Sequence, residues 1–343
     1  MKYKSTQPIW FLLFALILLS PACTDETPEQ PETPPPPPPI EDTQYPSYKV
    51  PAFSPDSAYT HVLKQVAFGP RVPGTEAHAA CRDWLVSKFE SYGLEVIKQS
   101  WEATAYDGKK MPATNIIAQY NPSARRRIVL SAHWDSRAFA DSPLSNERRD
   151  EAIDGADDGA SGVGVLLELG RLLQENPMDN FGVDLVLFDV EDQGESGGDD
   201  PSTWGLGSQY WSNNLHAPNY NPIYGILLDM IGSHTPRFTK DRVSMTYAPQ
   251  VMNKIWRLAH SMGHGNLFVD IPTGAIFDDH YFVNTIAEIP MIDIINKPAG
   301  SETGFGSYWH THDDNIDIIS PETLGIVGQV MAAVIYREAS GTL

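Results

Sequence analysis

One segment near the middle of the chain, residues 183–190 (VDLVLFDV), combines β-branched and aliphatic residues over the length of a β-strand. A nearly continuous apolar run is typical of a strand buried on both faces in a helix-covered parallel sheet. Glu191 and Asp192 follow directly. Because ligands of open α/β sheets bind beyond the carboxyl ends of the strands, this acidic pair is a candidate for chemistry. A solvated acidic turn is the alternative explanation.

Apolar periodicity elsewhere predicts helices that alternate with strands. Helices are expected between Ser54 and residue 66, between the RVPGT turn and Gly93, after the glycine-rich segment IDGADDGASG, and over 249–262 and 320–337. Further strands are expected at 94–99, 115–119, 127–133, 222–232, 266–271 and 290–294. This order predicts a three-layer α/β/α fold around a central mixed, mostly parallel sheet.

The first 44 residues have a different composition. Two lysines precede the apolar run 9–19, and Cys23 follows a small residue, a pattern typical of a bacterial lipoprotein signal sequence over residues 1–22. Ordinary cleavage beside an incidental cysteine is the alternative. Residues 23–44 are acidic and contain six consecutive prolines, which predicts an extended linker. We therefore expect a lipid anchor on Cys23 and attachment to the cell envelope of a Gram-negative bacterium, in the periplasm or at the outer-membrane surface.

Residues 45–343 are sufficient for one large α/β domain with a substantial core. The formal net charge of the chain is −20, which argues against a nucleic-acid partner. We expect a monomer. Cys81, the remaining cysteine, fits a small buried apolar position because no second thiol is left for a disulfide within the chain.

Histidines and carboxylates recur at the predicted strand ends and in the loops after them. Such a set without cysteine suits a catalytic Zn²⁺, which needs three protein ligands and an open position. One of Asp157 and Asp158 could cap the helix that follows, and the other would remain free for a metal. The recurring residues are His133, Asp158, Glu191, Asp192, Asp229 and His310.

The order of the motifs HWDS, GADDGASG, FDVED, LLDMIG and WHTHDDN resembles the glutaminyl cyclases (glutaminyl-peptide cyclotransferases) of the animal and bacterial type, relatives of the zinc aminopeptidases. The resemblance implies one Zn²⁺ per chain, held by Asp158, Asp192 and His310. The ligand register could slip by one, onto Asp157. Animal members carry Glu where this chain has Asp192, which makes the ligand one methylene shorter here.

The resemblance also implies a reaction in which the N-terminal glutamine of a peptide or protein cyclises to pyroglutamate and releases ammonia. Glu191 would transfer the proton from the α-amine to the leaving nitrogen. Asp279 would hydrogen-bond the departing amide nitrogen and communicate with Glu191 through Asp229. Trp309 and Trp204 would form walls of the substrate pocket.

Two other functions use the same residues. In a two-zinc aminopeptidase, His133 and Asp229 would hold a second zinc, Asp158 would bridge, and Glu191 would activate water. The acidic segment 278–280 has no obvious task in that reaction and favours the cyclase. A non-catalytic surface binding module is the third possibility, and the intact Glu191 argues against it.

Overall fold

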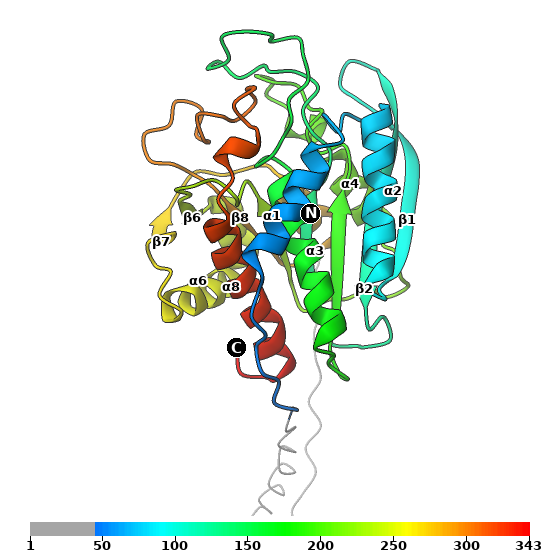
Figure 1. Cartoon of the computed structure of the whole chain (residues 1–343), viewed down its shortest axis with the longest axis vertical. Coiled ribbons are helices and arrows are strands. Elements are labelled where there is room, and N and C mark those ends of the chain that lie inside the picture. Colours follow the sequence, from blue (N-terminus) through cyan, green and yellow to red (C-terminus); the bar gives the residue numbers. More distant parts are fainter. Residues whose placement is uncertain (1–44) are drawn as a thin grey trace, which may run out of the picture. The chain divides into compact units, whose positions relative to one another are not determined.

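A mixed six-stranded sheet runs through the part of the chain that the computed structural model describes, residues 45–343 (Figure 1). The predicted signal sequence, the linker and Cys23 lie outside these residues. The four strands β3, β4, β5 and β8 are parallel, and β1 and β2 are antiparallel to their neighbours. The predicted mixed, mostly parallel sheet is confirmed. In spatial order the strands are β1 (Glu95–Thr104), β2 (Lys110–Tyr120), β4 (Gly182–Phe188), β3 (Arg127–His133), β5 (Gly225–Asp229) and β8 (Met291–Ile295).

Alternate residues of the central strands enter two different hydrophobic cores. In β4, Val183, Leu185 and Leu187 pack into the larger core, whereas Val186 and Phe188 pack into the core on the other side. All seven residues of β4 are buried. The apolar run therefore forms a strand covered on both faces, as its composition predicts.

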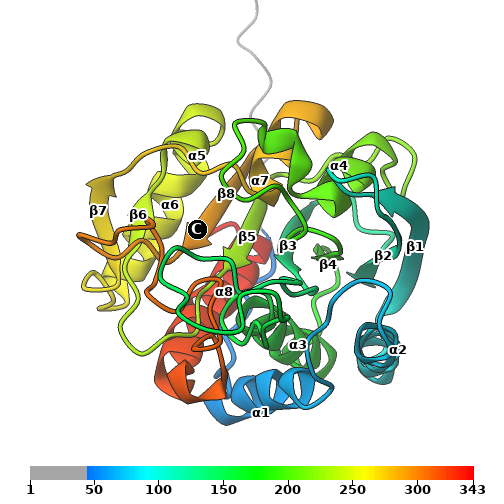
Figure 2. The ribbon, with the colours of Figure 1, turned by 90° about the horizontal axis from the view of Figure 1, so that it is seen from above.

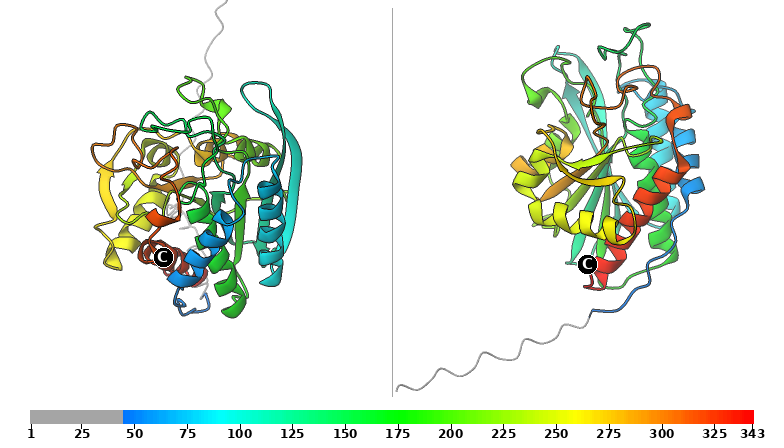
Figure 3. Two further views of the ribbon diagram at one scale, coloured as in Figure 1. Left: turned by 45° about the horizontal axis from the view of Figure 1, so that its top comes forward. Right: turned by 90° about the vertical axis from the view of Figure 1, so that its left-hand side faces the viewer.

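Helices cover both faces of the sheet (Figure 2 and Figure 3). One face carries α1 (Pro55–Val66), α2 (Glu76–Ser91), α3 (Ala160–Glu175) and α8 (Pro321–Ala339). The other carries α4 (Leu206–Asn213), α7 (Asp279–Phe282) and the π-helical turn Val283–Ala287. The side chains of Ser54 and Thr75 accept hydrogen bonds from the first turns of α1 and α2, which explains where these helices begin.

A peripheral part next to β8 departs from the prediction. The strand expected at 266–271 is present as β7 (Phe268–Pro272), but it pairs with β6 (Phe238–Lys240) in a separate two-stranded sheet. Most of its residues are at least partly exposed, so it lacks the two-sided burial of the central strands. The short elements β6, α5 (Arg242–Tyr247) and α7 contain too few residues for a periodic pattern. The remaining elements are α6 (Pro249–Ser261) and the 3₁₀ turns Pro201–Thr203 and Ile316–Ile318.

The chain connections reverse direction beside β3. From β3 the chain passes through α3 to β4 on one side of β3, and from β4 through α4 to β5 on the other side. Such a reversal opens a crevice at the carboxyl ends of the two strands that flank it, here β3 and β5. Their last residues are His133 and Asp229. None of the helices between residues 45 and 343 has the length and apolar content needed to cross a bilayer.

Candidate active site

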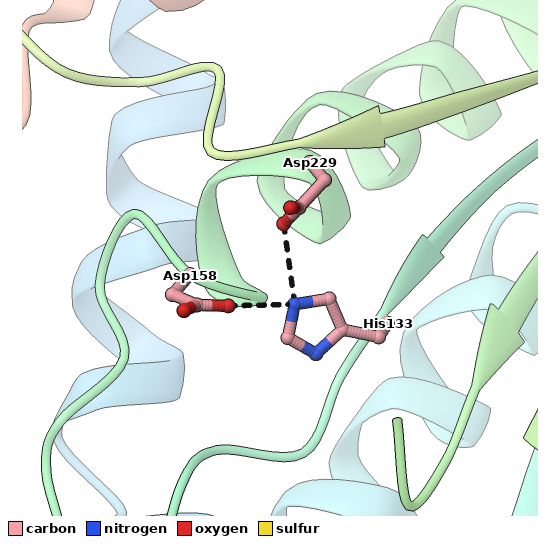
Figure 4. Close-up of side chains that lie close together, drawn as sticks. All are labelled: His133, Asp158 and Asp229. Atoms are coloured by element: carbon pink, nitrogen blue, oxygen red, sulfur yellow. Dashed lines mark hydrogen bonds and ion pairs between the residues drawn. The ribbon is translucent and has the colours of Figure 1, made fainter. Parts of the chain in front are cut away.

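His133, Asp158 and Asp229 meet in the crevice between β3 and β5 (Figure 4). The Nε2 atom of His133 lies 2.9 Å from Oδ1 of Asp158 and 3.3 Å from Oδ1 of Asp229. All three side chains are buried. Three residues from distant parts of the sequence therefore converge where the topology places a ligand site.

A second group shares Asp158 and adds one residue from each of two loops. Nε2 of His310 lies 3.0 Å from Oδ1 of Asp192 and 3.7 Å from Oδ2 of Asp158. Oδ2 of Asp192 is buried without a hydrogen-bond partner. A buried carboxylate oxygen without a partner is costly, and a cation would supply the missing interaction.

The donor atoms of each group lie close enough to hold a metal ion, within 4.8 Å of one another. One imidazole and two carboxylates match the nitrogen and oxygen ligands that catalytic zinc takes, so the residues Asp158, Asp192 and His310 fit the predicted ion. A third buried group within residues 45–343 consists of Asp278, His280 and Asp293.

Asp157 has other partners. Its carboxylate accepts a hydrogen bond from the amide of Gly232 at 2.6 Å and another from the hydroxyl of Tyr308. Burial raises the pKa of Asp157 to about 6. Neither Asp157 nor Asp158 caps α3, because the helix begins after Gly159, which has a left-handed backbone (φ 97°) and no side chain to donate or accept. Asp158, and not Asp157, is therefore the residue of this pair that belongs to both metal-binding groups.

Asp135 holds the loop that carries Glu191 and Asp192. Its carboxylate accepts hydrogen bonds from the amides of Glu191 at 3.0 Å and Asp192 at 3.2 Å. The residue before this pair, Val190, has a left-handed backbone (φ 56°) that a β-branched side chain rarely adopts. Strain of this kind costs about 1–3 kcal/mol and persists where the surrounding contacts over-determine the conformation. The acidic pair is therefore held in a fixed orientation.

The carboxyl of Glu191 is the candidate for proton transfer. Its pKa is raised well above the ordinary value by burial and by the negative charges of Asp278, Asp279 and Asp192, although His133 acts in the opposite direction. A carboxyl group whose pKa lies nearer to neutral can both accept and donate a proton at physiological pH.

Glu191 opens into a cavity of about 610 Å³ together with the whole second group and with Asp229 of the first group. Its floor is acidic, and one wall is an apolar cluster formed by Met230, Ile276 and Ile295 together with Phe305 and Trp309. The ring of Trp309 stacks on His310 with centroids 3.8 Å apart, and Trp204 lies 6.0 Å from the same imidazole. Both predicted pocket tryptophans thus line the cavity.

The structure places two neighbouring aspartates differently from the prediction. Asp278 lines the cavity, whereas Asp279, the residue proposed from the sequence, does not. Asp278 has an extended backbone and caps α7 by accepting a hydrogen bond from the amide of Asp279. Asp279 is already the first residue of the helix and is fully buried. An aspartate immediately before a helix is an N-cap signal, and it would have separated the two positions.

Sequence reasoning missed a second set of residues around His310. Nδ1 of His310 lies 3.2 Å from Oδ1 of Asp141, and Arg137 pairs with the same carboxylate at 2.6 Å. Arg137 also donates to the backbone oxygen of Asp192 at 2.9 Å, and its guanidinium lies 4.7 Å from the ring of Trp204. The loop after β3 therefore supports two metal-ligand candidates and one pocket wall.

The chain is similar to several known zinc-peptidase-like proteins. The sequence profile of peptidase family M28 matches residues 115–335. A glutaminyl-peptide cyclotransferase from Drosophila melanogaster is 26% identical over 275 residues, which cover 74% of this chain and 73% of that protein.

Several proteins of solved structure are more similar to this chain in sequence. The glutaminyl cyclase of Porphyromonas gingivalis is 46% identical, with a TM-score of 0.80 over 83% of this chain and 98% of that one. A Zn-dependent exopeptidase from Parabacteroides distasonis is 45% identical, with a TM-score of 0.81 over 84% of this chain and 99% of that one. The predicted resemblance is confirmed: the chain belongs to peptidase family M28 and shares its fold with bacterial glutaminyl cyclases.

Proposed function

We propose that this protein is a zinc-dependent glutaminyl-peptide cyclotransferase, which converts the N-terminal glutamine of peptides or proteins to pyroglutamate and releases ammonia. The observation that carries the proposal is the shared cavity: Glu191 opens into it beside Asp158, Asp192 and His310. The similarity to glutaminyl cyclases over more than four-fifths of the chain supports the same reaction.

Asp158, Asp192 and His310 would hold one zinc ion. The bound ion would supply Lewis-acid polarisation of the substrate's γ-carbonyl group. His310 would be kept in place by Asp141 on its other nitrogen and by Trp309 across its ring face. A partner on the second nitrogen of a ligating histidine orients the ring and raises its basicity.

Glu191 would move the proton that the reaction requires. The α-amine of the substrate attacks its own γ-amide carbon, a C–N bond forms, and the bond to the amide nitrogen breaks. One proton must pass from the amine to the leaving nitrogen, which departs as ammonia. The raised pKa of Glu191 suits both halves of this transfer. Because the attack is intramolecular, the pocket mainly has to hold one conformer of the glutamine side chain.

Asp278 would take the role that the sequence assigned to Asp279, a hydrogen bond to the departing amide nitrogen. It lines the cavity together with Asp229 and Glu191. Burial and the negative charge of Asp278 raise the pKa of Asp229 well above its ordinary value. Proton sharing with its carboxylate neighbours is how Asp229 would couple Asp278 to Glu191.

Trp309 and Trp204 would enclose the glutamine side chain and exclude water. Trp309 packs against the apolar cluster beside Phe305, with the centroids of the two rings 4.9 Å apart. Aromatic walls of this kind bury the aliphatic part of a ligand while leaving its amide free for polar contacts.

An aminopeptidase that uses two metal ions is the second candidate, because His133, Asp158 and Asp229 form a further group able to hold a metal. His133, however, does not line the cavity. A proton on its Nε2 atom would lie between the two carboxylates and satisfy both, and a second ion is then not needed.

A paired assay separates the two activities. The purified protein is given an N-terminal glutaminyl peptide, followed for pyroglutamate and ammonia, and separately a leucyl amide, with metal content measured on the same sample. We expect pyroglutamate, one zinc per chain and no leucine release. Leucine release with two zincs per chain would assign the protein to the aminopeptidases.

We also propose that a lipid on Cys23 attaches the protein, as a monomer, to the cell envelope of a Gram-negative bacterium. The position of Tyr45, the first described residue, supports an anchor that leaves the active site accessible. Tyr45 packs on Arg126 immediately before β3, with the guanidinium 4.0 Å from the ring. The site lies at the other end of β3, about 20 Å along the strand. Replacement of Cys23 by Ser should release the protein from membranes, and retention in the membrane fraction would argue against the anchor.

A further inference from the structure

Asp314 is a fully buried carboxylate in the loop that follows His310. Its Oδ1 accepts a hydrogen bond from the amide of Asp157 at 2.7 Å, and its Oδ2 accepts one from the amide of Asp158 at 3.2 Å. Both oxygens are therefore used to bind two consecutive amides of the loop that carries a metal-ligand candidate. No part of the proposed reaction uses Asp314.

Asp135 makes the same arrangement at the other acidic loop. Its two oxygens accept hydrogen bonds from the amides of Glu191 and Asp192, at 3.0 and 3.2 Å. Asp135 is also fully buried. The two carboxylate ligand candidates, Asp158 and Asp192, are thus held in the same way. In each case a buried aspartate from another loop accepts hydrogen bonds from the ligand's own amide and from the amide before it.

The contacts of Asp314 join two loops that each supply a ligand candidate. In addition to the two side-chain bonds, the amide of Ala156 donates to the backbone oxygen of Asp314 at 3.3 Å. On its own side, the amide of Asp314 donates to the backbone oxygen of Thr311 at 3.2 Å, in the turn directly after His310. One residue therefore connects the backbone at Asp158 with the backbone at His310, whose side chains lie 3.7 Å apart.

We propose that Asp314 is a positioning residue, which sets the separation of Asp158 and His310 and thereby the affinity of the site for its metal ion. The inference rests on the proposed metal site but not on the choice between cyclase and peptidase.

The charge of Asp314 makes its stabilising role specific to the metal-bound protein. A third buried carboxylate beside Asp157 and Asp158 adds repulsion to the metal-free protein, and a bound cation offsets that repulsion. Asparagine at this position would remove the repulsion but offers only one acceptor oxygen, so one of the two amides would face its NH₂ group. In the metal-free protein the removed repulsion offsets the lost amide hydrogen bond, so the substitution should weaken metal binding with little loss of metal-free stability.

The test uses the full-length protein with Asp314→Asn, and Asp313→Asn as the matched control because Asp313 is the exposed neighbour in the same DD pair. Zn²⁺ affinity is measured by competition with a chelator, and thermal unfolding is measured on the metal-free proteins. We expect Asp314→Asn to bind Zn²⁺ about 10–100-fold more weakly, in the range found for groups that orient metal ligands. The metal-free unfolding midpoint should stay the same or rise, the control should match the wild type, and excess Zn²⁺ should restore turnover.

Unchanged Zn²⁺ affinity in Asp314→Asn would overturn the proposal. So would a lower unfolding midpoint of the metal-free variant, because it would assign Asp314 a purely structural role. If Asp314→Asn does not fold, Asp314→Ser, which keeps one acceptor, takes its place, and failure of both to fold counts against the proposal. The measurements of Zn²⁺ affinity and of metal-free unfolding use no glutaminyl substrate, so these two results stand even if the cyclase assignment fails.

Discussion

Nε2 of His310 lies 3.0 Å from Oδ1 of Asp192, and the two residues are 1% and 2% exposed. The imidazole comes from the loop before α8 and the carboxylate from the loop after β4, so the contact depends on the whole fold. Asp158 completes the group through its second oxygen. This arrangement makes the identity of the metal ligands open to direct test.

Removal of either ligand candidate should abolish metal binding. We expect His310→Ala and Asp192→Ala to lose the zinc and the cyclase activity together, because a catalytic zinc site rarely keeps its ion with two protein ligands. His133→Ala should keep one zinc per chain. Metal analysis and the pyroglutamate assay on the three variants check this, and a wild type with two zincs, one of them lost in His133→Ala, would contradict it.

Replacement of Glu191 by Gln should leave the metal in place and lower turnover by about 10²–10⁴-fold, the contribution typical of general acid–base catalysis. The amide keeps the size of the side chain but cannot accept the proton. Glu195→Gln is a matched control, since Glu195 is exposed in the following loop. Loss of zinc from Glu191→Gln would instead identify Glu191 as a ligand.

The two neighbouring aspartates should respond differently to the same substitution. Asp278→Asn changes a residue of the cavity wall and should lower kcat by about 10²-fold or more, as expected when a hydrogen bond to the departing group is lost. Asp279→Asn changes a residue outside the cavity, and we expect its main effect on the unfolding midpoint. Steady-state kinetics and thermal unfolding of both variants decide the matter, and the reverse pattern would restore the role predicted from the sequence.

Trp309 should contribute mainly to substrate binding. Trp309→Ala removes the ring that stacks on His310 at 3.8 Å and contacts the apolar wall, and we expect KM to rise about tenfold. Trp309→Phe keeps an aromatic face and should recover most of the loss. An unchanged KM in Trp309→Ala would place the substrate elsewhere in the cavity.

His61 should make the stability of the domain depend on pH. Burial, helped by the positive charges of Lys88 and Arg171, lowers the pKa of His61 from 6.5 to about 4. The unfolded chain therefore takes up a proton at a higher pH than the folded one, and acid favours unfolding. The stability that comes from keeping His61 neutral is fully present above pH 6.5 and is lost as the pH falls towards 4. Denaturant unfolding at pH 7.5 and at pH 5 measures how far the free energy of unfolding falls between the two. This fall should be about 2 kcal/mol smaller in His61→Gln than in the wild type. Equal losses would contradict the assignment.

Much of this protein follows from local sequence patterns. The apolar run of β4, its alternation between two cores, and the caps of α1 and α2 are visible because strand and helix periods act over a few neighbouring residues. The strand-end positions of His133 and Asp229 are equally readable, since the carboxyl ends of parallel strands lie at one edge of a sheet. From these patterns the sequence alone determined the fold class and the location of the site at the strand ends, and the family resemblance supplied the expected roles of its residues.

The tertiary structure decided what depends on exact backbone direction and on loops. It determined that Asp158 rather than Asp157 belongs to the metal-binding groups, because Gly159 turns the chain into α3. It separated Asp278 from Asp279, since a one-residue shift at the start of a helix redirects a side chain. It also revealed the half-buried partner Asp141 and the buried partner Asp314, which lie in loops without periodicity. Their roles come from contacts between distant segments, and such contacts form only when the whole sheet and its loops have folded.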